Sequence, residues 1–161
     1  MRGSILNLSN LLNKLDEHKK KNQRIVFTNG CFDILHIGHV RYLSEAKSQG
    51  DVLVVGLNSD ASVRKIKEEQ RPIVDQDQRA EILASLKCVD YVTIFNDADP
   101  FELISAIKPD VLVKGADWKE EDIIGADVVK ANGGKVVRVP VVPESSTTDI
   151  IKKIIKLYTD D

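Results

Sequence analysis

The chain has few of the features that would place it in a specialised class of protein. Its 161 residues include only two cysteines, Cys31 and Cys88, which are too few for a disulfide framework or a four-ligand zinc site. No apolar run approaches the roughly 20 residues that a membrane-spanning helix needs. The first residues contain no apolar core of a signal peptide. We therefore expect a cytoplasmic protein with no membrane partner.

The sequence also lacks an excess of charge of either sign. Lys and Arg number 23 against 25 Asp and Glu, so the formal net charge is -2. A nucleic-acid-binding domain usually carries a large basic excess, so we expect no nucleic-acid partner. A phosphorylated small molecule needs only a few local cations and stays possible as a ligand. The 42% apolar and 30% charged content is typical of one globular domain of this length.

What the sequence does have is a regular alternation of short β-branched runs with segments of helical periodicity. Strands are predicted at residues 24–28, 51–57, 90–95, 110–114 and 135–139, and helices at 39–49, 76–86, 99–108, 120–131 and 148–158. Such alternation implies right-handed crossovers and a parallel sheet covered by helices on both faces. We predict a single α/β domain with a Rossmann-like, doubly wound parallel sheet over residues 23–161.

Both ends of the chain carry apolar residues at helical spacing. Residues 1–22 are expected to form an amphipathic helix and a linker before the domain. The last helix is expected to bury one apolar side against the domain. That side consists of Ile150, Ile151, Ile154, Ile155 and Tyr158.

Ligands of parallel sheets bind outside the carboxyl ends of the strands, so the turns after the strands are the places to search. The first strand runs into TNGCFDILHIGH, residues 28–39, which holds two of the three histidines of the chain. His36 and His39 lie three residues apart where a helix begins, and free N–H groups at that end of a helix bind anions. The same histidines could instead ligate a metal with Asp33, cap the helix or belong to the core.

The other turns contain polar residues whose roles the sequence leaves open. The charged segment 63–71 is either a solvated turn or a phosphate-binding loop. Asp117 could accept hydrogen bonds from ribose hydroxyls, and Trp118 could stack on a base or pack. Residues 145–148 suit a phosphate and equally suit an N-cap. Neither the G-x-G-x-x-G pattern nor a Walker A loop follows the first strand, which argues against a dehydrogenase or a P-loop kinase.

These segments together resemble the nucleotidyltransferase superfamily built around the His-x-Gly-His motif. Within it, the resemblance is to the adenylyltransferase domain of ADP-heptose synthases. The matching segments are residues 28–43, 58–67, 71–73, 112–118, 131–134 and 145–154. The resemblance implies a fold of the nucleotidyltransferase type. It also implies transfer of AMP from ATP to D-glycero-β-D-manno-heptose 1-phosphate, which gives ADP-heptose and pyrophosphate for lipopolysaccharide core or another surface glycan.

The resemblance also implies roles for individual residues. It makes His36, His39, Lys65 and Lys67 the catalytic set, which stabilises charge on the phosphates during in-line attack by the sugar phosphate. The implied nucleotide- and phosphate-binding residues are Thr28, Asn29, Gly30, Phe32, Gly38, Arg71, Gly115, Asp117, Trp118, Ser146, Thr147 and Thr148. A Mg²⁺ ion is expected with ATP, and Asp33 either contacts it or stabilises the turn. A homodimer is expected, with the upstream sugar kinase on a separate chain.

Two other functions compete with this interpretation. A cytidylyltransferase would make CDP-glycerol or a similar CDP-alcohol. Glycerol-phosphate cytidylyltransferases of this superfamily place an Arg shortly before the final Ser-Thr-Thr, and residues 140–144 contain none. A non-enzymatic module would bind ATP in the same cleft to regulate a partner, and the intact His36, Gly38 and His39 argue against it.

Overall fold

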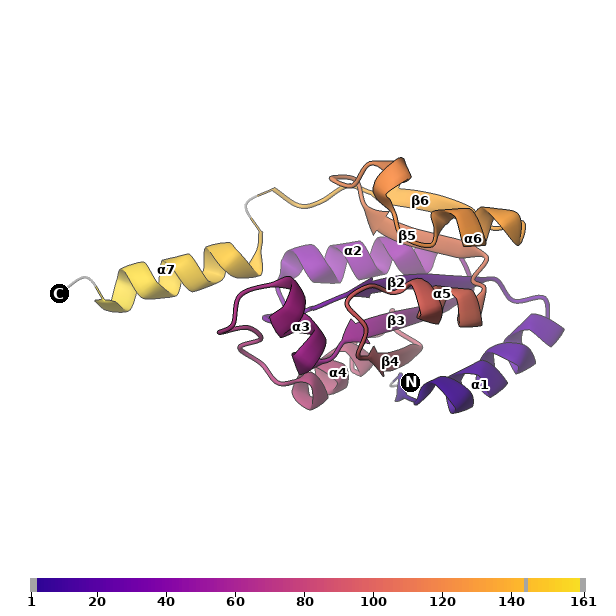
Figure 1. Cartoon of the computed structure of the whole chain (residues 1–161), viewed down its shortest axis with the longest axis horizontal. Coiled ribbons are helices and arrows are strands. Elements are labelled where there is room, and N and C mark those ends of the chain that lie inside the picture. Colours follow the sequence, from indigo (N-terminus) through magenta and orange to yellow (C-terminus); the bar gives the residue numbers. More distant parts are fainter. Residues whose placement is uncertain (1–2, 144, 160–161) are drawn as a thin grey trace.

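The computed structural model describes residues 3–143 and 145–159, which form a six-stranded, all-parallel sheet between two layers of helices (Figure 1). The strand order is β1-β4-β3-β2-β5-β6. The strands are β1 (Ser4–Ile5), β2 (Ile25–Gly30), β3 (Val52–Asn58), β4 (Tyr91–Phe95), β5 (Val111–Gly115) and β6 (Lys135–Val139). The helices are α1 (Leu8–Lys20), α2 (Ile37–Ser48), α3 (Asp60–Ile66), α4 (Gln76–Ala84), α5 (Phe101–Ile107), α6 (Ala126–Ala131) and α7 (Thr147–Thr159), with a 3₁₀ turn, η1, at Glu120–Asp122.

The two faces of the sheet bury separate cores. One core packs α2 and α4 against the sheet, through Leu43 of α2 and Leu83 of α4 among others. The other packs α1, α5 and α6 against the opposite face, through Leu15 of α1 and Ile104 of α5 among others. Every residue of β3 is buried, as expected of a central parallel strand covered on both faces. The predicted doubly wound α/β fold is therefore confirmed, and the strand order reverses at β2, which lies between β3 and β5.

The N-terminal segment belongs to the same sheet and core as the rest of the chain. The sequence analysis missed β1, which pairs with β4 at the edge of the sheet. Leu11 and Leu15 of α1 have 0% and 1% exposure within the second core. Residues 4–20 thus extend the domain, although they precede the range 23–161 expected for it.

Two helical regions differ from the sequence prediction. The sequence did not predict α3, which occupies part of the segment expected to be a charged loop. The expected helix 120–131 is interrupted between η1 and α6. The extended backbone of Ile123 ends η1, and Gly125, whose φ of 84° is left-handed, directly precedes α6.

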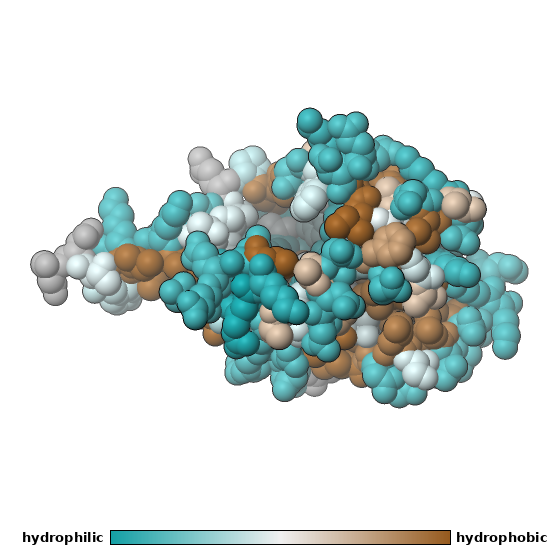
Figure 2. Space-filling model, in the orientation of Figure 1, coloured by the Kyte–Doolittle hydropathy of each residue, from teal (hydrophilic) through white to brown (hydrophobic). Residues whose placement is uncertain are grey.

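The prediction for the last helix is wrong in its packing. Its apolar residues do not form a buried face, because α7 projects away from the body of the molecule (Figure 1). Ile154, Ile155 and Tyr158 are 49%, 53% and 82% exposed, and Figure 2 shows the resulting hydrophobic patch on α7. The helical periodicity was correctly recognised, but it does not reveal which surface covers the apolar side.

A buried arginine connects the carboxyl ends of β2 and β3. The guanidinium of Arg79 in α4 donates hydrogen bonds to Cys31 O at 2.6 Å, Asn58 O at 2.9 Å and Val74 O at 2.8 Å. It also forms a 2.7 Å ion pair with Asp60. Because Cys31 follows β2 and Asn58 ends β3, Arg79 fixes the relative positions of the two strand ends.

Among the helices formed by residues 3–143 and 145–159, none has the length and the apolar content that a membrane span requires.

Candidate active site

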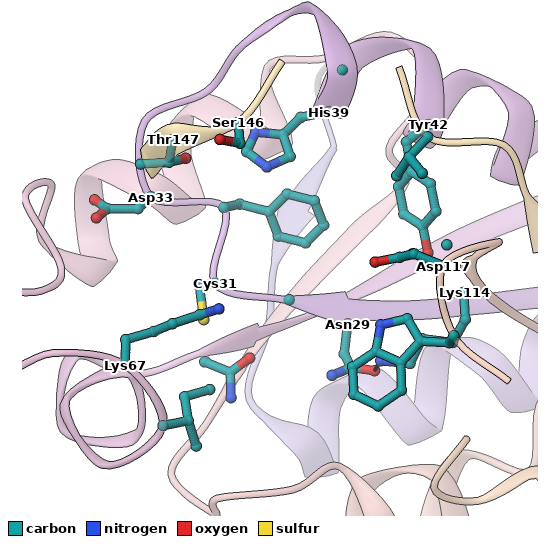
Figure 3. A pocket seen from close by; sticks show the side chains of 18 of the residues that line it. Asn29, Cys31, Asp33, His39, Tyr42, Lys67, Lys114, Asp117, Ser146 and Thr147 are labelled. Atoms are coloured by element: carbon teal, nitrogen blue, oxygen red, sulfur yellow. Dashed lines mark hydrogen bonds between the residues drawn. The ribbon is translucent and has the colours of Figure 1, made fainter. Parts of the chain in front are cut away.

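A cleft of about 650 Å³ opens at the carboxyl ends of β2, β3 and β5. This is the position that the parallel topology predicts for a ligand, and the volume lies within the range of small-molecule sites. The predicted site residues that line it are Asn29, Gly30, Phe32, Asp33, His36, Gly38, His39, Lys67, Arg71, Gly115, Asp117, Trp118, Ser146, Thr147 and Thr148. Figure 3 shows the cleft with His39, Ser146 and Thr147 along one side, Lys67 on another, and Asn29 beside Lys114 on a third.

The two motif histidines stack on each other at the start of α2. His36 has extended backbone and precedes the first residue of the helix, so His39 lies in its first turn. The ring centroids are 3.8 Å apart with an angle of 28° between the planes. A Cβ on Gly38 would lie 2.9 Å from the His36 ring, so only glycine leaves room for this arrangement. Phe32 supports the pair from below, because its ring meets that of His39 edge-on with centroids 5.1 Å apart.

Both histidines are held in the neutral form. Burial, and to a lesser extent the coulombic effect of the neighbouring His36 ring, together lower the pKa of His39 to about 4. Burial also lowers the pKa of His36. His39 Nδ1 is buried and has no hydrogen-bond partner among the described residues. Because a buried polar atom normally has a partner, this nitrogen and the free N–H groups of α2 are suited to receive the oxygens of a ligand.

The start of α7 lies beside the histidines. Ser145 Oγ and His36 Nδ1 share a hydrogen bond of 3.0 Å, and Thr147 Oγ1 donates to Ile34 O at 3.3 Å. Ser146 caps the helix, because its Oγ accepts a hydrogen bond from Asp149 N at 3.0 Å. Two helix N-termini therefore converge on one side of the cleft, and both dipoles favour a negatively charged ligand there.

Asp33 anchors the segment that follows α3. Its carboxylate accepts hydrogen bonds from Ile73 N at 2.9 Å, Val74 N at 2.8 Å and Arg71 Nε at 2.6 Å. Burial acts to raise the pKa of Asp33, but the hydrogen bonds from Val74, Ile73 and Arg71 outweigh it, and the pKa is lowered. The carboxylate is thus ionised and fully engaged with protein groups, which leaves it poorly suited to a metal. Among the described residues, no group of three or more His, Cys, Asp or Glu side chains could hold a metal ion.

The two predicted lysines are placed differently. Lys67 directly follows α3 and lines the cleft, whereas Lys65 is exposed on α3 and is absent from the lining. Thr28 is also absent from the lining, because it is buried in β2 with its Oγ1 2.7 Å from Tyr42 Oη. Thr28 therefore supports the floor of the cleft and does not face the ligand.

The exit of β5 supplies the remaining wall. Asp117 and Trp118 are exposed at the rim, with Trp118 47% exposed. A Cβ on Gly115 would clash with the Asp117 carboxylate, so glycine lets this turn close over the end of the strand. The side chains of Asp117 and Trp118 are therefore accessible to a ligand, and their contacts with ribose and base stay predictions.

The sequence analysis missed four polar residues of the lining. They are Tyr42, Asn58, Asp99 and Lys114. Tyr42 and Asn58 gave no usable signal, because a tyrosine in an amphipathic helix and an asparagine after an apolar strand are common. Lys114 did give one, because it interrupts the apolar run of β5 at the carboxyl end of the strand, where ligands bind.

Comparison with known proteins gives the chain its family. The Cytidylyltransferase-like family matches residues 27–153. The bifunctional protein HldE of Geobacter metallireducens is 54% identical over 157 residues, which cover 98% of this chain and 32% of that protein. The protein of the same name from Campylobacter concisus is 54% identical over 143 residues, 89% of this chain and 29% of its own length. The chain thus spans about a third of the length of these curated relatives.

Solved structures agree with this assignment. The lipopolysaccharide core biosynthesis protein from Thermoplasma volcanium superposes with a TM-score of 0.62 at 30% identity, over 76% of this chain and 99% of that one. Pantoate-beta-alanine ligase from Francisella tularensis superposes with a TM-score of 0.61 at 20% identity, over 99% of this chain and 80% of that one, which shows the fold alone. The chain belongs to the cytidylyltransferase-like family of nucleotidyltransferases, and His36-Ile37-Gly38-His39 is its His-x-Gly-His motif.

Proposed function

We propose that the chain transfers AMP from ATP to D-glycero-β-D-manno-heptose 1-phosphate, giving ADP-heptose and pyrophosphate for lipopolysaccharide core or a related surface glycan. The observation that carries the proposal is the convergence of two neutral histidines and two helix N-termini on one side of a cleft. The identity of about half the residues to proteins named HldE supports the heptose substrate. The similarity to the lipopolysaccharide core biosynthesis protein of Thermoplasma volcanium supports the proposed destination of the product.

In the proposed reaction, an oxygen of the sugar phosphate attacks the α-phosphorus of ATP. The new P–O bond forms as the bond to the pyrophosphate breaks, and pyrophosphate leaves from the opposite side. The histidines and the amides at the starts of α2 and α7 donate hydrogen bonds to the phosphate chain as negative charge shifts onto the leaving group. No protein nucleophile takes part, so positioning and electrostatic stabilisation supply the catalysis.

Mg²⁺ belongs to the proposal as the counter-ion that enters with ATP. The engaged carboxylate of Asp33 argues against a resident ion held by the protein. The reaction is placed in the cytoplasm, where ATP is available and where free thiols such as those of Cys31 and Cys88 persist. A sugar kinase reaction must supply the 1-phosphate. The relatives are named as bifunctional proteins, and the kinase expected on a separate chain stays a prediction.

A homodimer is also part of the proposal. The exposed Ile154, Ile155 and Tyr158 of α7 supply an apolar surface that a second copy would cover. Sedimentation of the wild type and of an Ile154→Ser/Ile155→Ser variant tests this, with a dimer expected for the first and a monomer for the second. A monomeric wild type would contradict it.

The substrate assignment is tested by measuring pyrophosphate release. ATP and CTP are each offered with heptose 1-phosphate, other sugar 1-phosphates and glycerol 3-phosphate. We expect turnover with ATP and heptose 1-phosphate to exceed every other pair. Turnover only with CTP and glycerol 3-phosphate would make the chain a cytidylyltransferase, and ATP binding without turnover of any acceptor would make it a sensing module.

A further inference from the structure

Lys114, at the carboxyl end of β5, is a largely buried cation without an anionic partner. Its Nζ donates a hydrogen bond to Asn29 Oδ1 at 2.7 Å and lies 5.6 Å from the centroid of the Trp118 ring. No carboxylate of the described residues forms a salt bridge with it. Buried charges are normally paired, because removing them from water is costly. An unpaired ammonium that lines a ligand cleft is therefore suited to receive its counter-ion from the ligand.

The electrostatics of Lys114 support this view. Burial lowers its pKa to about 8, although the ionised forms of Cys31 and Asp117 act to raise it. The side chain is thus mostly protonated at neutral pH, but its charge is poorly compensated. An incoming phosphate would restore the lost stabilisation by a charge-assisted hydrogen bond.

The position of Lys114 is set by rigid elements. β5 pairs with β2, so the end of β5 lies next to the strand that leads into the His-x-Gly-His turn. Tyr42 Oη donates to Val113 O at 3.0 Å and also contacts Thr28, which fixes the backbone just before Lys114. A side chain held by its own strand and by Asn29 is preorganised for a ligand.

The direction of the reaction decides which phosphate Lys114 meets. In-line displacement requires the attacking oxygen and the leaving pyrophosphate to lie on opposite sides of the α-phosphorus. The histidines and the start of α7 provide the donors for the pyrophosphate. Figure 3 shows Lys114 and Asn29 across the cavity from His39 and Ser146, where the attacking phosphate would enter.

We infer that Lys114 binds the phosphate of the acceptor and holds its attacking oxygen in line with the α-phosphorus. This inference rests on the proposed function, in that it assumes transfer to a phosphorylated acceptor. Asn29 assists by orienting the ammonium. The exposed Lys67 lies on another wall of the cleft and would contact the phosphates of the nucleotide instead.

The test compares steady-state constants of Lys114→Met and Lys114→Arg with the wild type. We expect Lys114→Met to raise the KM for the acceptor roughly 10- to 100-fold, the effect of losing a hydrogen bond between charged groups. The KM for ATP should change less than about threefold, and Lys114→Arg should recover most of the loss. The melting temperature of Lys114→Met should not fall, because an unpaired buried charge is removed.

Lys19→Met is the matched control. Lys19 Nζ also donates to a neutral oxygen, Ile107 O at 2.8 Å, but it lies on α1, away from the cleft. Neither KM should change in this variant. A rise in the KM for ATP with an unchanged KM for the acceptor would overturn the inference, and so would equal rises in both together with a lower melting temperature.

The outcome can be separated from that of the proposed function. If the wild type uses CTP and glycerol 3-phosphate instead, the heptose assignment fails. The KM for glycerol 3-phosphate is then compared between Lys114→Met and the wild type. If no acceptor turns over, calorimetric titration with heptose 1-phosphate in the presence of a non-hydrolysable ATP analogue replaces kinetics. Tighter binding by the wild type than by Lys114→Met supports the inference, and equal binding or none overturns it.

Discussion

The two sides of the cleft are built in different ways. On the α2–α7 side, stacked histidines, a serine hydrogen bond and two helix starts hold the donors in place before any ligand arrives. On the α3 side, Lys67 is exposed, and Arg71 is already paired with Asp33. Fixed donors best stabilise charge that develops in a transition state, whereas a flexible exposed cation mainly attracts the substrate. The comparison therefore predicts that the first side governs kcat and the second governs KM.

The largest expected effect comes from the histidines. His36→Ala or His39→Ala should lower kcat by about 10²- to 10³-fold, because each removes a preorganised donor to the phosphates. The dissociation constant for ATP, measured by calorimetry, should change much less. His18→Ala is the control, because His18 binds Gln23 and Tyr91 outside the cleft and should leave kcat unaltered. Wild-type kcat in both cleft variants would remove the proposed distinction.

A smaller effect is expected on the α3 side. Lys67→Ala should raise the KM for ATP about tenfold with little change in kcat, because one charge-assisted contact is lost. Lys65→Ala should change the KM for ATP less than about twofold, since Lys65 is exposed outside the cleft. The resemblance assigned both lysines to catalysis, so equal losses in the two variants would favour that assignment over the geometry.

The pH dependence of stability tests whether the histidine side is built for neutral rings. The pKa of His39 is lowered to about 4 in the folded chain, against about 6.5 when unfolded. The unfolded chain therefore binds a proton that the folded chain resists, so this contribution to stability is complete above pH 6.5 and is lost as the pH falls towards 4. His39→Asn should reduce the decline of the melting temperature over this interval. An equal decline in both proteins would mean that the ring is protonated without penalty.

The sequence predicted the fold and most of the cleft for clear physical reasons. Apolar runs in the sequence predicted β3 and the other interior strands. A parallel sheet brings the carboxyl ends of these strands to one edge, where the cleft lies. Gly38 and the two histidines show as a motif, although the sequence alone could not reveal that the rings stack and lose their charge. Lys65 and Lys67 look alike in sequence, and only the path of α3 separates them. The exposure of α7 could not be predicted, because an amphipathic pattern does not identify the surface against which the apolar side packs.

The central claim is that the cleft promotes direct in-line transfer without a covalent protein intermediate. It is tested most directly with a single diastereomer of ATP that carries sulfur at the α-phosphorus, by determining the configuration of that phosphorus in the nucleotide sugar formed. One displacement inverts the configuration, and two successive displacements restore it. We predict inversion. Retention would contradict the account, because it would require a protein nucleophile to take up the nucleotidyl group first.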